Sequence, residues 1–293
     1  MRILFIGSVE FSRRALDMLL TTDAQIVGVC TLQQSAFNAD HCDLSVICEA
    51  HRIPWVYAPD INTDKTFQWM ADQKPDVIFC FGWSRLLGTR VLNLARLGVV
   101  GFHPAALPAN RGRHPLIWAL ALGLRETAST FFFMKGGADN GDILLQQKLE
   151  IEENDNATTL YEKMTLCALE QIRIFLPQLV SGDYTRTIQD ERYANTWRKR
   201  KESDGRIDWR MSAYSIHNLA RALSKPYVGA GFLYQGQEYK AWKTEIVSDV
   251  PPNVEPGKVF KIVDRGPIVK CGELGICVLE TKPLFRPSLG EYL

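Results

Sequence analysis

Short apolar runs alternate with amphipathic segments over the first part of the chain. Apolar runs predict buried strands at residues 3–7, 26–30, 54–56, 77–81 and 99–102. Between them, apolar residues at helical spacing predict helices at 11–20, 44–51 and 67–73. Continuously apolar strands separated by helices are typical of a parallel sheet covered on both faces. The pattern therefore predicts a Rossmann-like α/β domain with a mostly parallel sheet, which we expect to span residues 1–185.

A pair of strands and a long helix are expected to complete this domain. Apolar residues at 131–134 and 143–145 flank the Gly- and Asp-rich segment 135–142, which predicts two strands joined by a loop. The amphipathic segment 158–180 predicts a helix that begins at a threonine cap. Pro177 is expected to kink or end this helix, because proline removes a backbone donor.

The pattern changes after residue 181. Polar residues dominate up to 205 and include a run of Arg and Lys at 198–201, which could either contact phosphate or be a solvated linker. We assign 186–205 to a linker. Short apolar runs with Gly turns between them then predict strands at 231–234, 239–242, 258–262, 268–270 and 276–279. We therefore expect a small, mainly β, OB-like or barrel-like domain at 206–293.

Charge and composition restrict the classes of partner. The chain has 293 residues and a formal net charge of +1, without a long basic run, which argues against dependence on a nucleic-acid backbone. No stretch is long and apolar enough for a membrane span, and Glu10 and Arg13 interrupt the apolar start too early for a signal peptide. The seven cysteines are scattered and lack CxxC spacing, which favours a reducing cytoplasm over a disulfide framework or a zinc site.

Candidate chemistry lies in loops at the expected carboxyl ends of strands, where sheets of this class bind ligands. The loop at 7–12 has one glycine, so a dinucleotide site is poorly supported. The loop at 81–88 combines glycines with large apolar residues, which suits a flat ring system but also ordinary packing. His103 directly follows a strand and could be a general base or a structural residue. Asp139, in the next Gly-rich loop, could orient it.

Several segments resemble the methionyl-tRNA formyltransferase and sugar N-formyltransferase family. The specific central block comprises residues 101–104, 107–108, 111–112, 117–120 and 138–144. Residues 7–11, 203–209 and 221–230 resemble further family signatures, so that the resemblance covers nearly the whole chain. It implies a 10-formyltetrahydrofolate-dependent N-formyltransferase that needs no metal.

The resemblance also implies catalytic residues. The family pairs an asparagine and a histidine two positions apart with a loop aspartate, and these positions fall on Gly101, His103 and Asp139. His103 is then the base and Asp139 its orienting partner. Gly101 has no side chain to polarise the formyl oxygen, so backbone N–H groups, a water or a side chain such as Asn110 would have to replace the asparagine. A non-catalytic folate-binding relative is the alternative.

The resemblance places the pterin ring of the folate against residues 81–87 and the loop at 135–142. The predicted folate contacts are Phe81, Gly82, Trp83, Leu86, Leu87, Gly136, Ala138 and Asp142.

The acceptor amine is expected on a nucleotide-linked amino-dideoxy sugar, with a methionyl-tRNA as the alternative. The loop at 31–43 is long and basic in the tRNA enzymes, whereas here it has no Lys or Arg and contains Asp40 and Asp43. Residues 111–115 resemble formyltransferases of 4-amino-4,6-dideoxy sugars, including those of pseudaminic-acid-type pathways. The predicted substrate contacts are Arg111, Arg113, His114, Pro226 and Tyr227. The C-terminal domain could also mediate a homodimer.

Overall fold

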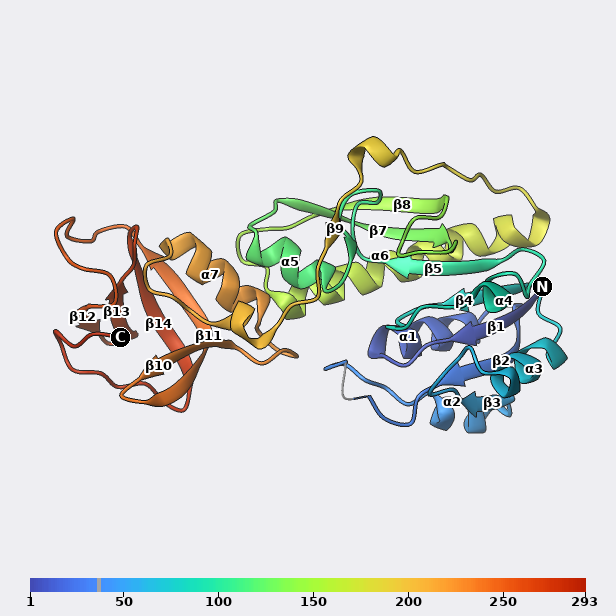
Figure 1. The fold of residues 1–293 in the computed structure, drawn as a ribbon, viewed down its shortest axis with the longest axis horizontal. Helices are drawn as coiled ribbons and strands as arrows, with labels where there is room; N and C mark the ends of the chain where they lie inside the picture. The colour runs from blue at the N-terminus through green and yellow to red at the C-terminus, as the bar shows by residue number, and fades with distance from the viewer. Residues whose placement is uncertain (36–37) are drawn as a thin grey trace. The chain divides into compact units, whose positions relative to one another are not determined.

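The computed structural model describes residues 1–35 and 38–293, which form two compact units. The first unit comprises residues 1–112, 128–149 and 163–196, and the second comprises 113–127, 150–162 and 197–293. Figure 1 labels the helices and strands. Residues 36–37, within the loop at 31–43 considered above, lie outside the described residues.

The sheet of the first unit has seven strands in the order β3-β2-β1-β4-β5-β7-β8. The strands β1 to β5 are parallel, whereas β7 pairs antiparallel with β5. This confirms the predicted α/β class with a mostly parallel sheet. The strands are β1 (Arg2–Ile6), β2 (Gln25–Thr31), β3 (Trp55–Tyr57), β4 (Val77–Cys80), β5 (Val99–His103), β7 (Glu126–Phe133) and β8 (Ile143–Glu150).

The predicted helices near this sheet begin and end close to the expected positions. They are α1 (Glu10–Leu19), α2 (Ser45–His51), α3 (Asp64–Asp72) and the long α6 (Ala157–Ser181). The short α4 (Thr89–Leu92) was not predicted. The predicted threonine cap of α6 is wrong, because the cap is Asn156, whose Oδ1 accepts from the backbone N–H groups of Thr158 and Thr159. Pro177 lies inside α6, and the helix continues past it to Ser181.

A cluster of phenylalanine rings forms the core on one face of this sheet. Phe131 of β7 lies 5.1 Å from Phe81 and 5.0 Å from Phe102, measured between ring centroids. Phe11 of α1 packs 4.4 Å from Phe102, and Phe175 of α6 packs 4.8 Å from Phe131. Because side chains alternate across a strand, the neighbours of Phe102 in β5 point to the opposite face. These neighbours are Gly101 and His103.

The second unit contains a five-stranded antiparallel sheet in the order β10-β11-β14-β13-β12, with β10 and β12 at its edges. The strands are β10 (Ala230–Tyr234), β11 (Gln237–Val247), β12 (Val259–Val263), β13 (Gly266–Lys270) and β14 (Gly275–Lys282). They match the five predicted apolar runs. Short helices and strands outside the two sheets are α5 (Pro115–Ala121), β6 (Arg111–Gly112), β9 (Thr196–Trp197), η1 (Glu191–Tyr193) and η2 (Glu202–Gly205).

Two helices of this unit, α5 and α7 (Ala213–Ala222), were not predicted from the sequence. The helix α7 packs against β11 and α5, with Ile216 and Leu219 buried. Its signal was a cap, since Ser212 Oγ accepts from the Ser215 N–H, followed by apolar residues at helical spacing. Among the residues that the structure describes, no helix is both long and apolar enough to cross a membrane.

The half-buried His217 of α7 should make the second unit sensitive to acid. Its Nδ1 lies 3.0 Å from Thr244 Oγ1, and burial, together with Arg221, lowers its pKa below the ordinary 6.5. In the unfolded chain His217 has its ordinary pKa of 6.5, so at a pH below 6.5 the unfolded chain binds more protons than the folded chain. The free energy of unfolding therefore decreases as the pH falls. Urea unfolding at about pH 7 and about pH 5 should show a smaller decrease for His217→Gln than for the wild type. The same decrease in both would contradict this, and His51→Gln, at an exposed position of α2, is the control.

Candidate active site

His103 ends β5 and is only 5% exposed. Its Nε2 lies 2.8 Å from the backbone carbonyl oxygen of Asn110. A carbonyl oxygen can only accept, so this contact assigns the proton of the neutral imidazole to Nε2. The lone pair of the ring is then on Nδ1.

Asp139 faces that lone pair. Its Oδ2 lies 3.6 Å from His103 Nδ1 and accepts a hydrogen bond of 2.9 Å from the backbone N–H of Gly112. The structure thus brings together the two side chains that the sequence analysis paired. Two acceptors that face each other across this gap can share an N–H donor or a proton between them.

Asp139 reaches His103 by an indirect path. Since β7 runs antiparallel to β5, its last residue, Phe133, pairs with Val100 near the start of β5. The segment 135–142, which we call the Asp139 loop, therefore begins near the amino end of β5, whereas His103 lies at the carboxyl end. The loop must fold back along the strands to reach His103. Its base is closed by a hydrogen bond from the Phe133 N–H to the Asp142 carbonyl and by an ion pair between Lys135 and Asp142.

Arg111 is a buried residue whose guanidinium is already occupied. The side chain is 8% exposed, donates twice to Gln189 Oε1, and forms a two-pronged ion pair with Glu191 at 2.8 and 2.9 Å. The predicted contact of Arg111 with a pyrophosphate would require these bonds to be exchanged.

Gln189 was not identified from the sequence. It lies in the segment assigned to a linker, yet it is only 6% exposed and donates to the backbone carbonyls of Asp139 and Gly141 at 2.8 and 2.6 Å. A single glutamine in a polar segment has no periodic signal, so only its tertiary contacts reveal it.

Gly101 faces a space that is already filled. A Cβ atom added here would lie 2.8 Å from Met134 Cγ, 3.0 Å from Met134 Sδ and 3.2 Å from Phe132 Cζ. The thioether side chain of Met134 therefore occupies the volume into which a side chain at position 101 would project.

The residues predicted to contact folate have different surroundings. The ring of Phe81 is fully buried in the phenylalanine cluster, whereas Leu86 is 65% exposed and Leu87 is buried. Gly82 has φ +70° and lies against Val9 and Ser12, so that no other residue fits there without strain. The indole Nε1 of Trp83 is buried without a hydrogen-bond partner among the described residues.

The part of the Asp139 loop predicted to contact folate lies mostly at the surface. Gly136 and Ala138 are exposed, and the partly buried Asp142 forms the ion pair with Lys135. Asn140 Oδ1 is buried and has no partner among the described residues, while its Nδ2 donates to the Gly136 carbonyl.

The other predicted substrate residues belong to the second unit. His114 has φ +56° and caps α5, and burial, together with the charges of Arg200, Arg113 and Lys199, lowers its pKa. The Arg200 guanidinium lies 4.6 Å from the ring centroid of Trp118, one turn after His114. Pro226 is exposed and Tyr227 half-buried, and both follow α7.

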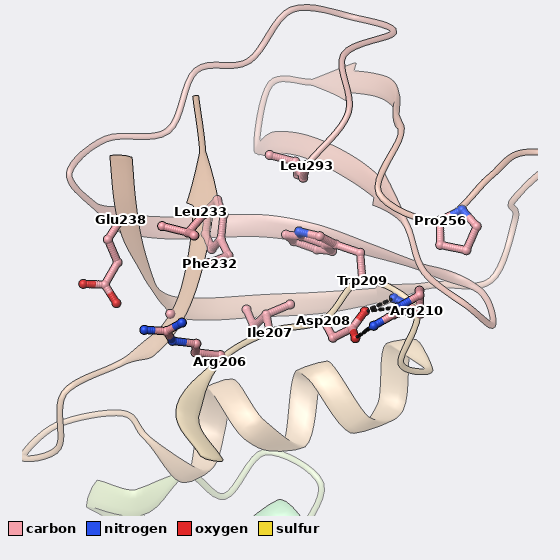
Figure 2. A pocket seen from close by; sticks show the side chains of 11 residues that line it. Arg206, Ile207, Asp208, Trp209, Arg210, Phe232, Leu233, Glu238, Pro256 and Leu293 are labelled. Atoms are coloured by element: carbon pink, nitrogen blue, oxygen red, sulfur yellow. Dashed lines mark hydrogen bonds and ion pairs between the residues drawn. The ribbon is translucent and has the colours of Figure 1, made fainter. Parts of the chain in front are cut away.

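A separate cavity of about 590 Å³ lies in the second unit (Figure 2). Trp209, Phe232 and Leu233 contribute its apolar wall, and Asp208 is paired with Arg210 at its rim. None of the predicted site residues lines this cavity. Within the described part of the chain, no group of three His, Cys, Asp or Glu side chains is arranged to hold a metal ion.

Two family models match the chain. Residues 1–172 match the model described as formyl transferase, and residues 199–286 match the formyl transferase C-terminal domain. Together they cover most of the chain and both sheets.

Solved structures with the same fold include sugar and tRNA enzymes. An N-formyltransferase from Helicobacter canadensis in complex with folinic acid and dTDP-3-aminofucose is 15% identical, with a TM-score of 0.71 and 94% of this chain and 98% of that chain covered. The methionyl-tRNA formyltransferase of Clostridium thermocellum is 17% identical, with a TM-score of 0.61 and coverage of 85% and 95%. HypX from Aquifex aeolicus is 18% identical, with a TM-score of 0.66 and 96% of this chain covered. This chain spans only 44% of the HypX chain.

The packing of Gly101 against Met134 can be tested by a pair of substitutions. Gly101→Asn should lower the free energy of unfolding by about 1–3 kcal/mol, because the new Cβ overlaps Met134 Cγ. Met134→Ala in the same chain should recover part of that loss by making room. Urea unfolding of both single variants and the double variant measures the coupling. Additive losses would show that the two positions do not compete for space.

Proposed function

The chain belongs to the formyl transferase family, and we propose that it is a formyltetrahydrofolate-dependent formyltransferase whose acceptor is the amino group of a nucleotide-linked amino-dideoxy sugar. The 4-amino-4,6-dideoxy type is favoured. The observation that carries the proposed chemistry is the distance of 3.6 Å between Nδ1 of the buried His103 and Oδ2 of the partly exposed Asp139.

In the proposed reaction, His103 acts through Nδ1. 10-Formyltetrahydrofolate supplies the formyl group on N10, the acceptor amine forms a new C–N bond to the formyl carbon, and the bond to N10 breaks. His103 Nδ1 takes the proton that the amine loses and returns it to N10. The Asn110 carbonyl fixes the tautomer through Nε2, and Asp139 stabilises the imidazolium once Nδ1 is protonated.

The polar groups near the predicted folate contacts suit a pterin. Trp83 Nε1 and Asn140 Oδ1 are a donor and an acceptor without a partner in the described ranges 1–35 and 38–293. A buried polar group without a partner costs free energy that a ligand can recover. A pterin carries both donors and acceptors on its ring edge. We propose these two side chains as folate contacts in addition to the backbone around Gly82.

Two lines of support favour a sugar acceptor over a tRNA. The first is that the loop at 31–43 has no Lys or Arg. In this loop, His41 Nδ1 lies 2.9 Å from the Ser8 carbonyl oxygen. Asp43 accepts from Tyr57 and from the Ser45 N–H. Two sugar N-formyltransferases match nearly full length, the Helicobacter canadensis enzyme and WlaRD, a sugar 3N-formyl transferase solved in the presence of dTDP and 5-N-formyl-THF (TM-score 0.70, 17% identity, 95% and 97% coverage).

We propose that the nucleotide diphosphate contacts the second unit. The cations Arg113, Lys199 and Arg200 lie close enough to His114 to lower its pKa, and Arg200 is half-buried beside Trp118. A diphosphate at these cations would accept charge-assisted hydrogen bonds. Tyr227 and Pro226 remain the proposed contacts of the nucleobase.

The reaction can be tested by mass spectrometry. Purified protein with 10-formyltetrahydrofolate and dTDP-linked 4-amino or 3-amino sugars should yield a sugar heavier by one formyl group. His103→Ala should lower kcat at least 100-fold, since general base catalysis contributes about 10²–10⁴-fold. A formyl gain only on methionyl-tRNA would contradict the sugar proposal. Folate binding without transfer to any acceptor would favour a non-catalytic relative.

The diphosphate contacts can be tested by calorimetry with dTDP. Arg200→Ala should weaken binding by about 10-fold or more, the effect of losing a charged hydrogen bond. Binding near pH 6.5 should take up more protons, or release fewer, in the wild type than in His114→Asn, because the bound diphosphate raises the lowered pKa of His114. Titrations in buffers of different ionisation enthalpy measure this difference. Equal binding by Arg200→Ala and by the exposed control Lys65→Ala would refute these contacts.

A further inference from the structure

We propose that Gln189 is a positioning residue that holds the Asp139 loop against His103, and that Arg111 orients the Gln189 amide. This inference rests on the proposed roles of His103 and Asp139. It gives Arg111 a function in shaping the site rather than in contacting the substrate.

The Gln189 carboxamide has a definite orientation. Its two N–H groups donate to the carbonyls of Asp139 and Gly141, and its Oε1 accepts from Nε and Nη2 of Arg111 at 3.2 and 2.7 Å. A flipped amide would turn its oxygen toward two carbonyl oxygens and its NH₂ toward a guanidinium. Only the observed orientation satisfies all four bonds.

The Asp139 loop depends on external support. It begins near the amino end of β5, away from His103, and Gly136, Gly137 and Ala138 are exposed. Asp139 itself adopts φ +53°, a left-handed conformation that is less favourable for most non-glycine residues but that aspartate tolerates. Gln189 bonds the carbonyl of this residue directly.

The same support continues through three consecutive residues of the chain. The Asn110 carbonyl accepts from His103, Arg111 bonds Gln189, and the Gly112 N–H donates to Asp139 Oδ2. Arg111 is fixed in turn by the Glu191 carboxylate, and its backbone N–H donates to the Asn195 carbonyl. The segment 189–195 thus sets the distance between the base and the aspartate.

The experiment compares substitutions at two buried glutamines. Gln189→Glu keeps the oxygen that accepts from Arg111 but removes the donors to Asp139 and Gly141, and Gln189→Leu removes both functions. Gln171, 2% exposed on α6, donates to the Ser129 carbonyl at 3.1 Å, so Gln171→Leu is a matched control for the loss of a buried amide.

Both Gln189 variants should lower kcat on the order of 100-fold, because a misplaced catalytic group slows the chemical step. They should raise the KM for folate by a smaller factor, because Asn140 of the same loop is a proposed folate contact. Gln171→Leu should lower Tm without a comparable loss of kcat. Arg111→Lys should reduce kcat in the wild type but cause little further loss in Gln189→Leu, since both act on the same loop.

A second readout does not depend on activity. Hydrogen exchange of the backbone amides at 135–142 should accelerate in Gln189→Leu and remain as in the wild type in Gln171→Leu. Unchanged exchange in Gln189→Leu, or a kcat loss no larger than that of Gln171→Leu, would overturn the proposed role. If the wild type forms no product while exchange responds as expected, the proposed function fails and the support of the loop by Gln189 stands.

Discussion

The segment Asn110 to Gly112 is bonded on one side to His103 and on the other to the Asp139 loop. This double attachment is needed because β7 runs antiparallel to β5. The loop after β7 therefore begins near the amino end of β5, away from His103. A loop after a parallel strand would have emerged beside His103 directly. The arrangement of His103 and Asp139 therefore depends on hydrogen bonds between loops, and these extend to Gln189 and Asn195.

Because side chains alternate along β5, the residue that packs in the core and the residues of the candidate site lie on opposite faces of the sheet. Phe102 packs into the phenylalanine cluster with Phe131, while Gly101 and His103 face the other side of the sheet. The phenylalanine cluster holds β5 in place, and the position of β5 in turn determines the position of the His103 imidazole. On the opposite face, Met134 fills the space beside Gly101, so a side chain at position 101 would compete with Met134 for that space.

The fold could be predicted from local patterns because burial follows periodicity. The apolar runs at 77–81 and 99–102 became β4 and β5, and the five runs after 230 became the second sheet. The helix α7 was missed although its pattern was present. His103 and Asp139 were identified through the family resemblance, and the structure brings them together. Gln189 and Met134 were not found, because each acts through contacts with residues distant in the sequence that no local pattern encodes.

The position of Gln189 and Glu191 also constrains how such proteins can be recombined. The segments matched by the two family models end at residue 172 and begin again at 199, so both side chains lie in the interval between them. A chimera that takes this interval from the parent of its C-terminal half would combine one parent's Arg111 with another parent's partners. Crossovers between related chains should therefore be made after Asn195, so that the connecting segment is inherited together with the strand that carries the histidine.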